Sequence, residues 1–120
     1  MDHCKLAELA VERAKKIESI SKIVLYGSVL NGGYTSENDI DLAFILDDFS
    51  RGLPLDLEGI PLGLPQDVNR RLVPLDGRFH IVFYYASDYE NGIILHDGQG
   101  RKPSLLHEIG KVIYDSELPI

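Results

Sequence analysis

The sequence predicts a small α/β or α+β domain in which helices pack against one β-sheet. The chain has 120 residues, which is enough for one hydrophobic core and too few for a second full domain, so residues 1–120 are expected to form a single domain. Segments with helical spacing of apolar residues also alternate along the chain with short apolar runs rich in β-branched residues. That alternation is typical of helices layered on a sheet.

The first part of the chain predicts two helices and two strands. Residues 3–18 have the pattern of an amphipathic helix, with apolar residues at three- and four-residue spacing. The apolar run 22–26 predicts a buried strand. A short helix is expected over 28–34, and a polar turn over 35–38 separates it from a second strand over 39–46.

The middle of the chain is dominated by a segment without regular pattern. Residues 47–65 hold three prolines and three glycines, which exclude a long regular element and predict a loop or flap. Loops of this length are often functional. A short helix is expected over 66–73, and the turn at Asp76–Gly77 leads into a third strand over 78–85.

The last part of the chain predicts shorter elements. Residues 86–98 are mixed in character, with Ser87–Asp88 as a candidate helix cap. Residues 103–109 predict a helix that ends at the following glycine. Residues 111–114 are expected to form a short strand or an extended tail.

Composition excludes several classes of function. The chain has 19 acidic and 12 basic residues and a net charge of −7, which argues against broad binding to nucleic acids or anionic membranes. The single cysteine, Cys4, excludes an internal disulfide framework and fits a reducing compartment. No apolar run approaches the roughly 20 residues that span a bilayer, and no signal peptide is visible. We therefore expect a cytoplasmic protein that does not associate with membranes.

Residues with a chemical use are concentrated in the segment 24–46. A buried strand ends in Gly27–Ser28, ten residues follow, and Asp39 then opens the next strand. Gly27 has no Cβ and therefore allows a ligand to approach the backbone closely. Ser28, at the expected start of a helix, offers a hydroxyl and free backbone N–H groups to phosphate oxygens.

The second motif of this segment is a pair of carboxylates. Asp39 and Asp41 are two residues apart, which on a strand puts both side chains on one face, while Ile40 and Leu42 point into the core. The carboxylates repel each other unless a cation neutralises them, and Mg²⁺ favours such ligands together with substrate phosphates. Each motif alone is common as a simple turn or a solvated strand edge. The two in this order favour a site for phosphoryl or nucleotidyl transfer.

These motifs resemble the signature of the minimal nucleotidyltransferases of the DNA polymerase β-like superfamily. The signature is an apolar strand ending in Gly-Ser, a short interval, and Asp-x-Asp followed by apolar residues. In this chain it is Val24-Leu25-Tyr26-Gly27-Ser28 and, ten residues later, Asp39-Ile40-Asp41-Leu42, a spacing similar to that of antitoxin-type members. The ending over 105–115 also resembles the closing pattern of the family.

The resemblance implies a nucleotidyltransferase-like mixed sheet and a metal-dependent transferase. The expected reaction moves a nucleoside monophosphate from a nucleoside triphosphate, with ATP expected, to an acceptor hydroxyl. Gly27 and Ser28 would hold the triphosphate, and Asp39 and Asp41 would bind Mg²⁺ or Mn²⁺. The resemblance further implies a small all-helical partner of the HEPN type, paired as toxin with antitoxin, that carries the acceptor. The base preference and the oligomeric state, a homo-oligomer included, stay open.

One position departs from the family pattern. Active members usually carry a third carboxylate on a later strand, and the matching place in this chain is His80. Alternation puts His80 on one strand face with Arg78, Val82 and Tyr84. His80 is a candidate metal ligand, better suited to Mn²⁺ or Zn²⁺ than to Mg²⁺, and a candidate general base. The alternative is a degenerate module that binds a partner or a nucleotide without turnover.

Overall fold

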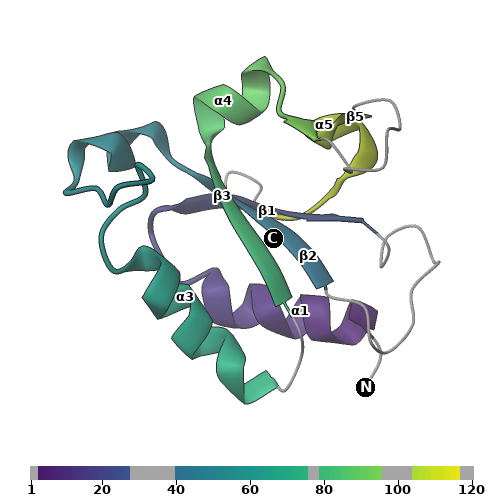
Figure 1. Ribbon diagram of the computed structural model, residues 1–120. Coiled ribbons are helices and arrows are strands. Elements are labelled where there is room, and N and C mark those ends of the chain that lie inside the picture. The colour runs from purple at the N-terminus through teal and green to yellow at the C-terminus, as the bar shows by residue number, and fades with distance from the viewer. Residues whose placement is uncertain (1–2, 28–39, 76–78, 96–103, 117–120) are drawn as a thin grey trace.

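The computed structural model describes residues 3–27, 40–75, 79–95 and 104–116, and its main element is a four-stranded mixed sheet (Figure 1). The sheet order is β3-β2-β1-β6. β1 pairs antiparallel with both β2 and β6, whereas β2 pairs parallel with β3. The strands are β1 (Ile20–Tyr26), β2 (Ile40–Leu46), β3 (Phe79–Tyr85) and β6 (Lys111–Asp115).

The remaining elements cover the two faces of this sheet. Helices α1 and α3 lie together on one face, and α4 and α5 lie toward the other (Figure 1). The helices are α1 (His3–Ala14), α3 (Leu64–Leu72), α4 (Ala86–Asn91) and α5 (Leu106–Ile109). Two 3₁₀ helices, η1 (Asp48–Gly52) and η2 (Val73–Leu75), and a small ribbon of β4 (Ile94–Leu95) with β5 (Ser104–Leu105) complete the described residues. The predicted α+β class with a mixed sheet flanked by helices is therefore confirmed.

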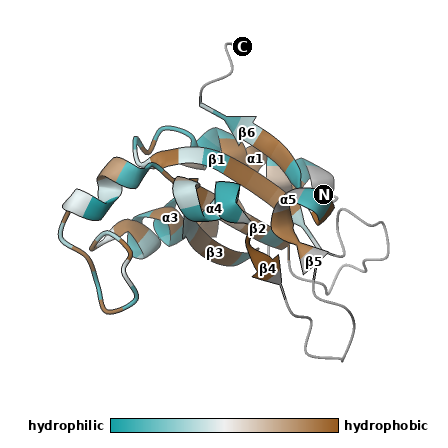
Figure 2. Cartoon of the chain, turned by 90° about the horizontal axis from the view of Figure 1, so that it is seen from above, coloured by the Kyte–Doolittle hydropathy of each residue, from teal (hydrophilic) through white to brown (hydrophobic). Residues whose placement is uncertain are grey.

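Burial of apolar side chains on both sheet faces holds the fold together, and Figure 2 shows apolar residues running along the strands. The larger core lies between the sheet and the pair α1 and α3, with Phe44 and Phe83 packed at a ring-centroid distance of 5.8 Å. A smaller core on the other face contains Val24, Ala43 and Leu106. β2 is central, and every one of its residues is buried except Asp41. Asp41 is therefore the one residue of β2 that solvent reaches.

Several predicted elements agree with the structure apart from their ends. The first helix ends at Ala14 rather than at residue 18, because the chain must turn before entering β1 at Ile20. The helix expected over 66–73 begins two residues earlier, at Leu64, after Gly63 in a left-handed conformation. The expected short helix over 28–34, the turn over 35–38 and the Asp76–Gly77 turn lie outside the described residues.

Two local predictions in the last third differ from the structure. Ser87 and Asp88 do not cap a helix. They lie within α4, which begins at Ala86 and has Tyr85 as its N-cap. The helix expected over 103–109 is only the four residues of α5, since Ser104 and Leu105 instead pair with β4. The predicted tail forms the strand β6, which is one of the two forms that the sequence left open.

The proline-rich segment 47–65 has no long element, as predicted, and contacts within it fix its path. The carboxylate of Asp56 accepts hydrogen bonds from the backbone N–H groups of Glu58 and Ile60, at 2.9 and 3.0 Å. Leu55 and Pro61 form an isolated bridge. Within the ranges that the structure covers, no helix is long and apolar enough to cross a membrane.

Candidate active site

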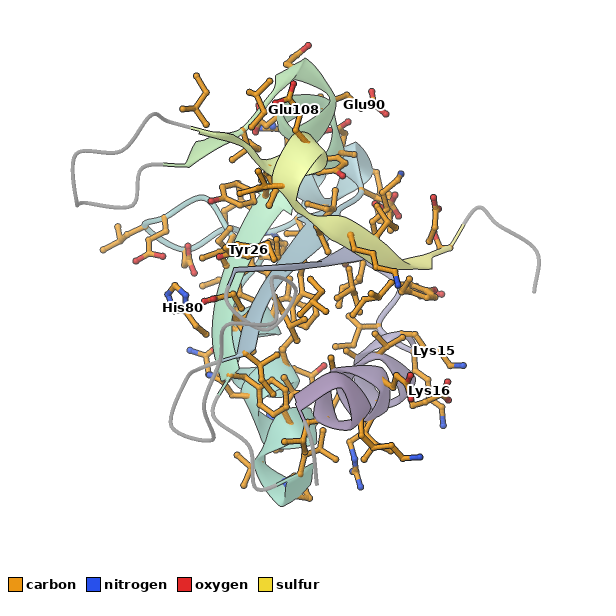
Figure 3. The ribbon with its side chains drawn as sticks, turned by 90° about the vertical axis from the view of Figure 1, so that its right-hand side faces the viewer. Lys15, Lys16, Tyr26, His80, Glu90 and Glu108 are labelled. Atoms are coloured by element: carbon orange, nitrogen blue, oxygen red, sulfur yellow. The ribbon has the colours of Figure 1, made fainter. Side chains whose placement is uncertain are left out.

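The candidate site is a row of three polar residues across the sheet. Tyr26 of β1 pairs in register with Asp41 of β2, and Asp41 pairs with His80 of β3. Residues paired in this way present their side chains on the same face of a sheet. Figure 3 labels Tyr26 and His80, which come from the strands on either side of Asp41. The row lies at the start of β2 and β3 and at the end of β1, so three strand termini position it.

Asp41 and His80 contact each other directly. Nδ1 of His80 lies 3.1 Å from Oδ1 of Asp41, and the two side chains are 59% and 24% exposed, respectively. When Nδ1 carries the proton and donates it to this carboxylate, Nε2 keeps a lone pair that can accept a proton or bind a metal. Because both side chains are reachable from solvent, a substrate can approach the pair.

Gly27 shapes the space in front of the carboxylate. Its φ is +83°, a conformation that residues with a side chain rarely adopt. A Cβ at this position would collide with Oδ2 of Asp41 and would lie 3.1 Å from Cγ of the same side chain. The chain therefore needs glycine here for two reasons, backbone conformation and contact with Asp41. The absent side chain leaves a cradle beside the second carboxylate oxygen.

Two tyrosines line the same face beyond this pair. Burial, the Asp41 carboxylate and Tyr84 raise the pKa of Tyr26 to about 12. Burial also raises the pKa of Tyr84. Tyr26 is therefore a neutral phenol at physiological pH and cannot serve as a base there. Sequence reasoning placed Tyr26 only in a buried strand, although its position directly before Gly27 was a usable signal for a site residue.

The structure brings together three of the residues that the sequence singled out. Gly27, Asp41 and His80 converge, whereas Ser28 and Asp39 lie outside the described residues. Ile40 and Leu42 are fully buried in the larger core, as predicted. Val82 and Tyr84 pack against the smaller core, on the His80 face of β3, and the Arg78 prediction is not covered. In the described part of the chain, no three His, Cys, Asp or Glu side chains gather as a metal-binding group.

Comparisons with known proteins agree with this fold. A solved structure from Sulfolobus solfataricus, described as that of a candidate nucleotidyltransferase, aligns over 94% of this chain and 80% of its own, with a TM-score of 0.53 and 15% identity. At that identity the likeness concerns the fold alone. A comparison with curated proteins found no match. A sequence model of the family described as "Polymerase beta, Nucleotidyltransferase" matches residues 8–72, more than half of the chain. The matched segment contains Gly27 and Asp41, and the chain belongs to this nucleotidyltransferase family.

Proposed function

We propose that the protein transfers a nucleoside monophosphate from a nucleoside triphosphate to an acceptor hydroxyl. The observation that carries this proposal is the position of Asp41, which lies between the cradle at Gly27 and the imidazole of His80. Membership of a nucleotidyltransferase family supports the reaction class. A carboxylate that can be reached from solvent, beside a glycine that admits close approach, suits binding of a metal-bound triphosphate.

The residues present fit a divalent metal. Asp41 offers hard oxygen ligands, and a Cβ at Gly27 would fill the space beside one of them. We assign metal binding to Asp41 together with Asp39, with Mg²⁺ or Mn²⁺ as the ion. When bound, such an ion neutralises the carboxylates and the phosphates and favours attack at the α-phosphorus.

The side chains then divide the remaining work. Gly27 and Ser28 bind the triphosphate through backbone N–H groups and the serine hydroxyl. Nε2 of His80 accepts the proton of the attacking hydroxyl, while Nδ1 is held by Asp41. Tyr26 cannot take that proton at neutral pH, because burial and the Asp41 carboxylate raise its pKa and disfavour its anion. His80 therefore replaces the third carboxylate in function as well as in position.

Finer assignments rest on the antitoxin-type motif spacing. We propose ATP as the donor and a hydroxyl side chain of a partner protein as the acceptor. A small all-helical protein of the HEPN type, acting as the toxin of a toxin–antitoxin pair, is the partner that this resemblance favours. A cytoplasmic location is proposed because the chain has a single cysteine, which fits a reducing compartment.

A second candidate function is a binding module without turnover. The histidine at the third-carboxylate position favours it, because His80 takes up one oxygen of Asp41 and adds no negative charge for a second metal. Such a module would bind a partner stably, and that binding would survive Asp41→Ala.

Transfer of a label separates the two candidates. The protein is incubated with α-labelled ATP, Mg²⁺ or Mn²⁺, and the product of any neighbouring gene for a small helical protein. The proposal expects label on that partner and release of pyrophosphate, both lost in Asp39→Asn and Asp41→Asn and retained in Asp67→Asn, an acidic-to-amide control on α3. If the wild type and Asp41→Asn transfer the same amount of label, the protein does not catalyse the proposed reaction.

A further inference from the structure

We infer that the free edge of β3 binds an extended segment of the acceptor protein as an additional strand and presents a hydroxyl residue of that segment to His80. This inference rests on the proposed nucleotidyl transfer and adds how the acceptor is held. It starts from β3 (Phe79–Tyr85), which pairs with β2 on one side and has no strand partner on its other side among the described strands.

The exposed edge of β3 lacks the features that usually prevent strand pairing. From Ile81 to Tyr85 the strand is apolar or aromatic and contains no charge and no proline. Its residues Ile81 to Tyr84 are only half-buried, although their types normally belong in a core. Native proteins commonly protect such edges with charges, prolines or bulges. A long apolar edge without that protection fits a surface that a partner strand covers.

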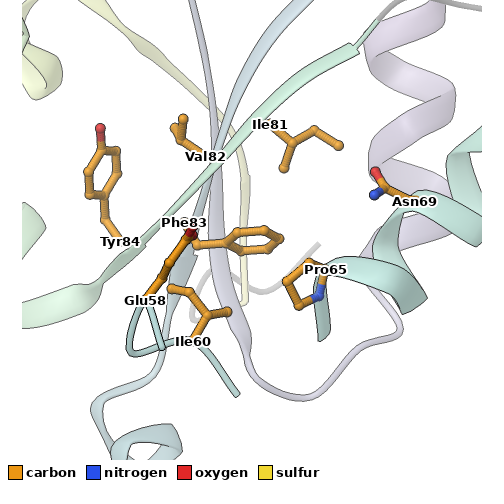
Figure 4. Close-up of a pocket in the computed structure, with 8 residues that line it drawn as sticks. All are labelled: Glu58, Ile60, Pro65, Asn69, Ile81, Val82, Phe83 and Tyr84. Atoms are coloured by element: carbon orange, nitrogen blue, oxygen red, sulfur yellow. The ribbon is translucent and has the colours of Figure 1, made fainter. Parts of the chain in front are cut away.

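A groove runs beside this edge and has room for side chains. Its volume is about 430 Å³, and Figure 4 shows its lining from β3 on one side and from α3 and the preceding loop on the other. Ile81 and Phe83 point toward α3, which carries Pro65 and Asn69, whereas Val82 and Tyr84 point to the opposite face. The remaining lining residues are Glu58, Ile60 and Asn69. A strand added here would place alternate side chains on apolar groups, which is how strand-addition sites gain specificity.

The wall of the groove is fixed before any ligand arrives. The hydroxyl of Tyr85 donates a 2.7 Å hydrogen bond to the carbonyl oxygen of Gly59, which joins the loop to the end of β3. The guanidinium of Arg51 lies 4.0 Å above the Tyr85 ring and also binds Asp88 at 2.8 Å. Because these contacts already position the loop, peptide binding does not include the entropic cost of ordering the loop.

The charge of the groove indicates the chemistry of its ligand. Glu58 is the one charged residue among its lining residues, and within the described ranges its carboxylate forms no ion pair. The protein as a whole carries −7. An extended segment with apolar residues at alternate positions and a lysine or arginine near Glu58 is therefore complementary, whereas an acidic segment is repelled.

The register connects this edge to the candidate site. His80 lies on β3 immediately before the groove residues, in line with Asp41 and Tyr26. Neighbouring strands are about 4.8 Å apart, and paired residues share a face, so the docked residue beside His80 points to the Asp41 side. A Tyr, Ser or Thr there would bring its hydroxyl to the imidazole. Its oxygen bonds to the α-phosphorus, the bond to the bridging oxygen of the β-phosphate breaks, pyrophosphate leaves, and the hydroxyl proton passes to Nε2 of His80.

Amide hydrogen exchange on the intact protein tests the docking without any need for catalysis. The probes are short synthetic peptides in which valine alternates with polar residues around a central tyrosine, with lysine near both ends. One matched peptide carries glutamate for lysine, and another is N-methylated along one backbone edge. With the lysine peptide at about ten times its dissociation constant, exchange at the free-edge amides within 79–85 should slow by about tenfold. The glutamate and N-methylated peptides should give much weaker protection.

Paired variants test the charge assignment. Glu58→Lys should weaken binding of the lysine peptide about fivefold, because an attraction between exposed charges becomes a repulsion. Glu90→Lys, the same exposed change on α4, should leave binding unaltered; circular dichroism verifies the fold of both. The inference is overturned if none of the peptides slows amide exchange within 79–85. It is also overturned if these amides become protected without peptide, because the protein self-associates through this edge.

Activity measured in parallel separates this inference from the proposed function. Protection at β3 without transfer of label to the peptide tyrosine, with the natural partner also unlabelled, supports docking and contradicts nucleotidyl transfer. Transfer to the natural partner with no protection anywhere along β3 supports nucleotidyl transfer and overturns docking at this edge.

Discussion

Nδ1 of His80 lies 3.1 Å from Oδ1 of Asp41, on two parallel neighbouring strands that hold these residues in direct register. The contact directs one nitrogen of the imidazole to the carboxylate and leaves the other for chemistry. In the proposed reaction this histidine is the proton acceptor, at the position where the resemblance to the minimal nucleotidyltransferases implies a third carboxylate. The consequences for catalysis and stability can be measured.

Replacing His80 tests its role as the base. His80→Ala should slow transfer by about a hundredfold or more, with little change in KM for the nucleotide, because the proton acceptor is lost and the triphosphate site is kept. Steady-state kinetics with Mg²⁺ measures both values. An unchanged kcat would show that His80 takes no proton from the acceptor.

Restoring a carboxylate gives the opposite kind of test. His80→Asp puts a second negative charge beside Asp41, so we expect a lower free energy of unfolding without divalent metal and recovery when Mg²⁺ is added. Urea denaturation with and without Mg²⁺ measures the difference. The matched variant is His80→Asn, which has a similar shape without the charge and should gain less stability from added Mg²⁺ than His80→Asp does.

Gly27→Ala should damage both stability and nucleotide binding. The positive φ alone costs about 1–3 kcal/mol for a residue with a side chain, and the new Cβ also collides with the Asp41 carboxylate. Gly59→Ala is the matched control, because Gly59 has nearly the same φ, +81°, and nothing lies within 4 Å of its added Cβ. We expect both variants to lose stability and only Gly27→Ala to lose binding of metal–ATP by calorimetry. Equal binding by the two would argue against a cradle at Gly27.

Gly110 provides a prediction about packing away from the site. A Cβ there would lie 2.5 Å from Cγ1 of Val24 and 2.8 Å from the carbonyl oxygen of Leu106. Gly110→Ala should therefore lower the free energy of unfolding by about 1–3 kcal/mol, as overpacking does. Gly52→Ala, where the added Cβ meets nothing within 4 Å, should change it by less than about 0.5 kcal/mol. Urea denaturation midpoints compare the two.

The contact between Asp48 and Ser87 predicts a pH dependence. The hydroxyl of Ser87 donates a 2.8 Å hydrogen bond to Asp48 and is the main cause that lowers the pKa of this carboxyl in the folded protein. A lowered folded pKa adds stability above the unfolded pKa of about 4, and this stability is lost as the pH falls through the folded value. The difference in free energy of unfolding between wild type and Asp48→Asn should therefore become smaller as the pH falls from 5 to 2. If Ser87→Ala leaves that dependence unchanged, the hydrogen bond is not its cause.

Local patterns predicted most of the fold because they report burial. The apolar runs within 22–26, 39–46 and 78–85 are strands, since apolar residues are needed on both faces of central strands or on the helix-covered face. The helix expected over 103–109 begins later than predicted, at Leu106, because β5 pairs with β4, ten residues earlier, and a contact between distant segments leaves little trace in local spacing.

The residues of the candidate site could be predicted to a similar degree. The motif identified Gly27 and Asp41, and alternation along 78–85 put His80 on one face with Val82 and Tyr84. The role of Tyr26 depends on its register with Asp41, which only the sheet pairing reveals. The groove beside β3 needed α3 and the loop before it in three dimensions, so no single segment could indicate it.

Paramagnetic broadening by Mn²⁺ with a non-hydrolysable ATP analogue tests the central claim most directly, because it locates the metal-bound triphosphate without requiring turnover. We predict that NMR signals of the His80 ring and of the Gly27 and Asp41 amides broaden first, and that Asp41→Asn abolishes this broadening. Signals of Glu90 on α4 should stay sharp throughout. If the His80 and Gly27 signals remain sharp while Mn²⁺ and the analogue bind elsewhere or not at all, the nucleotidyl-transfer site described for this protein does not exist.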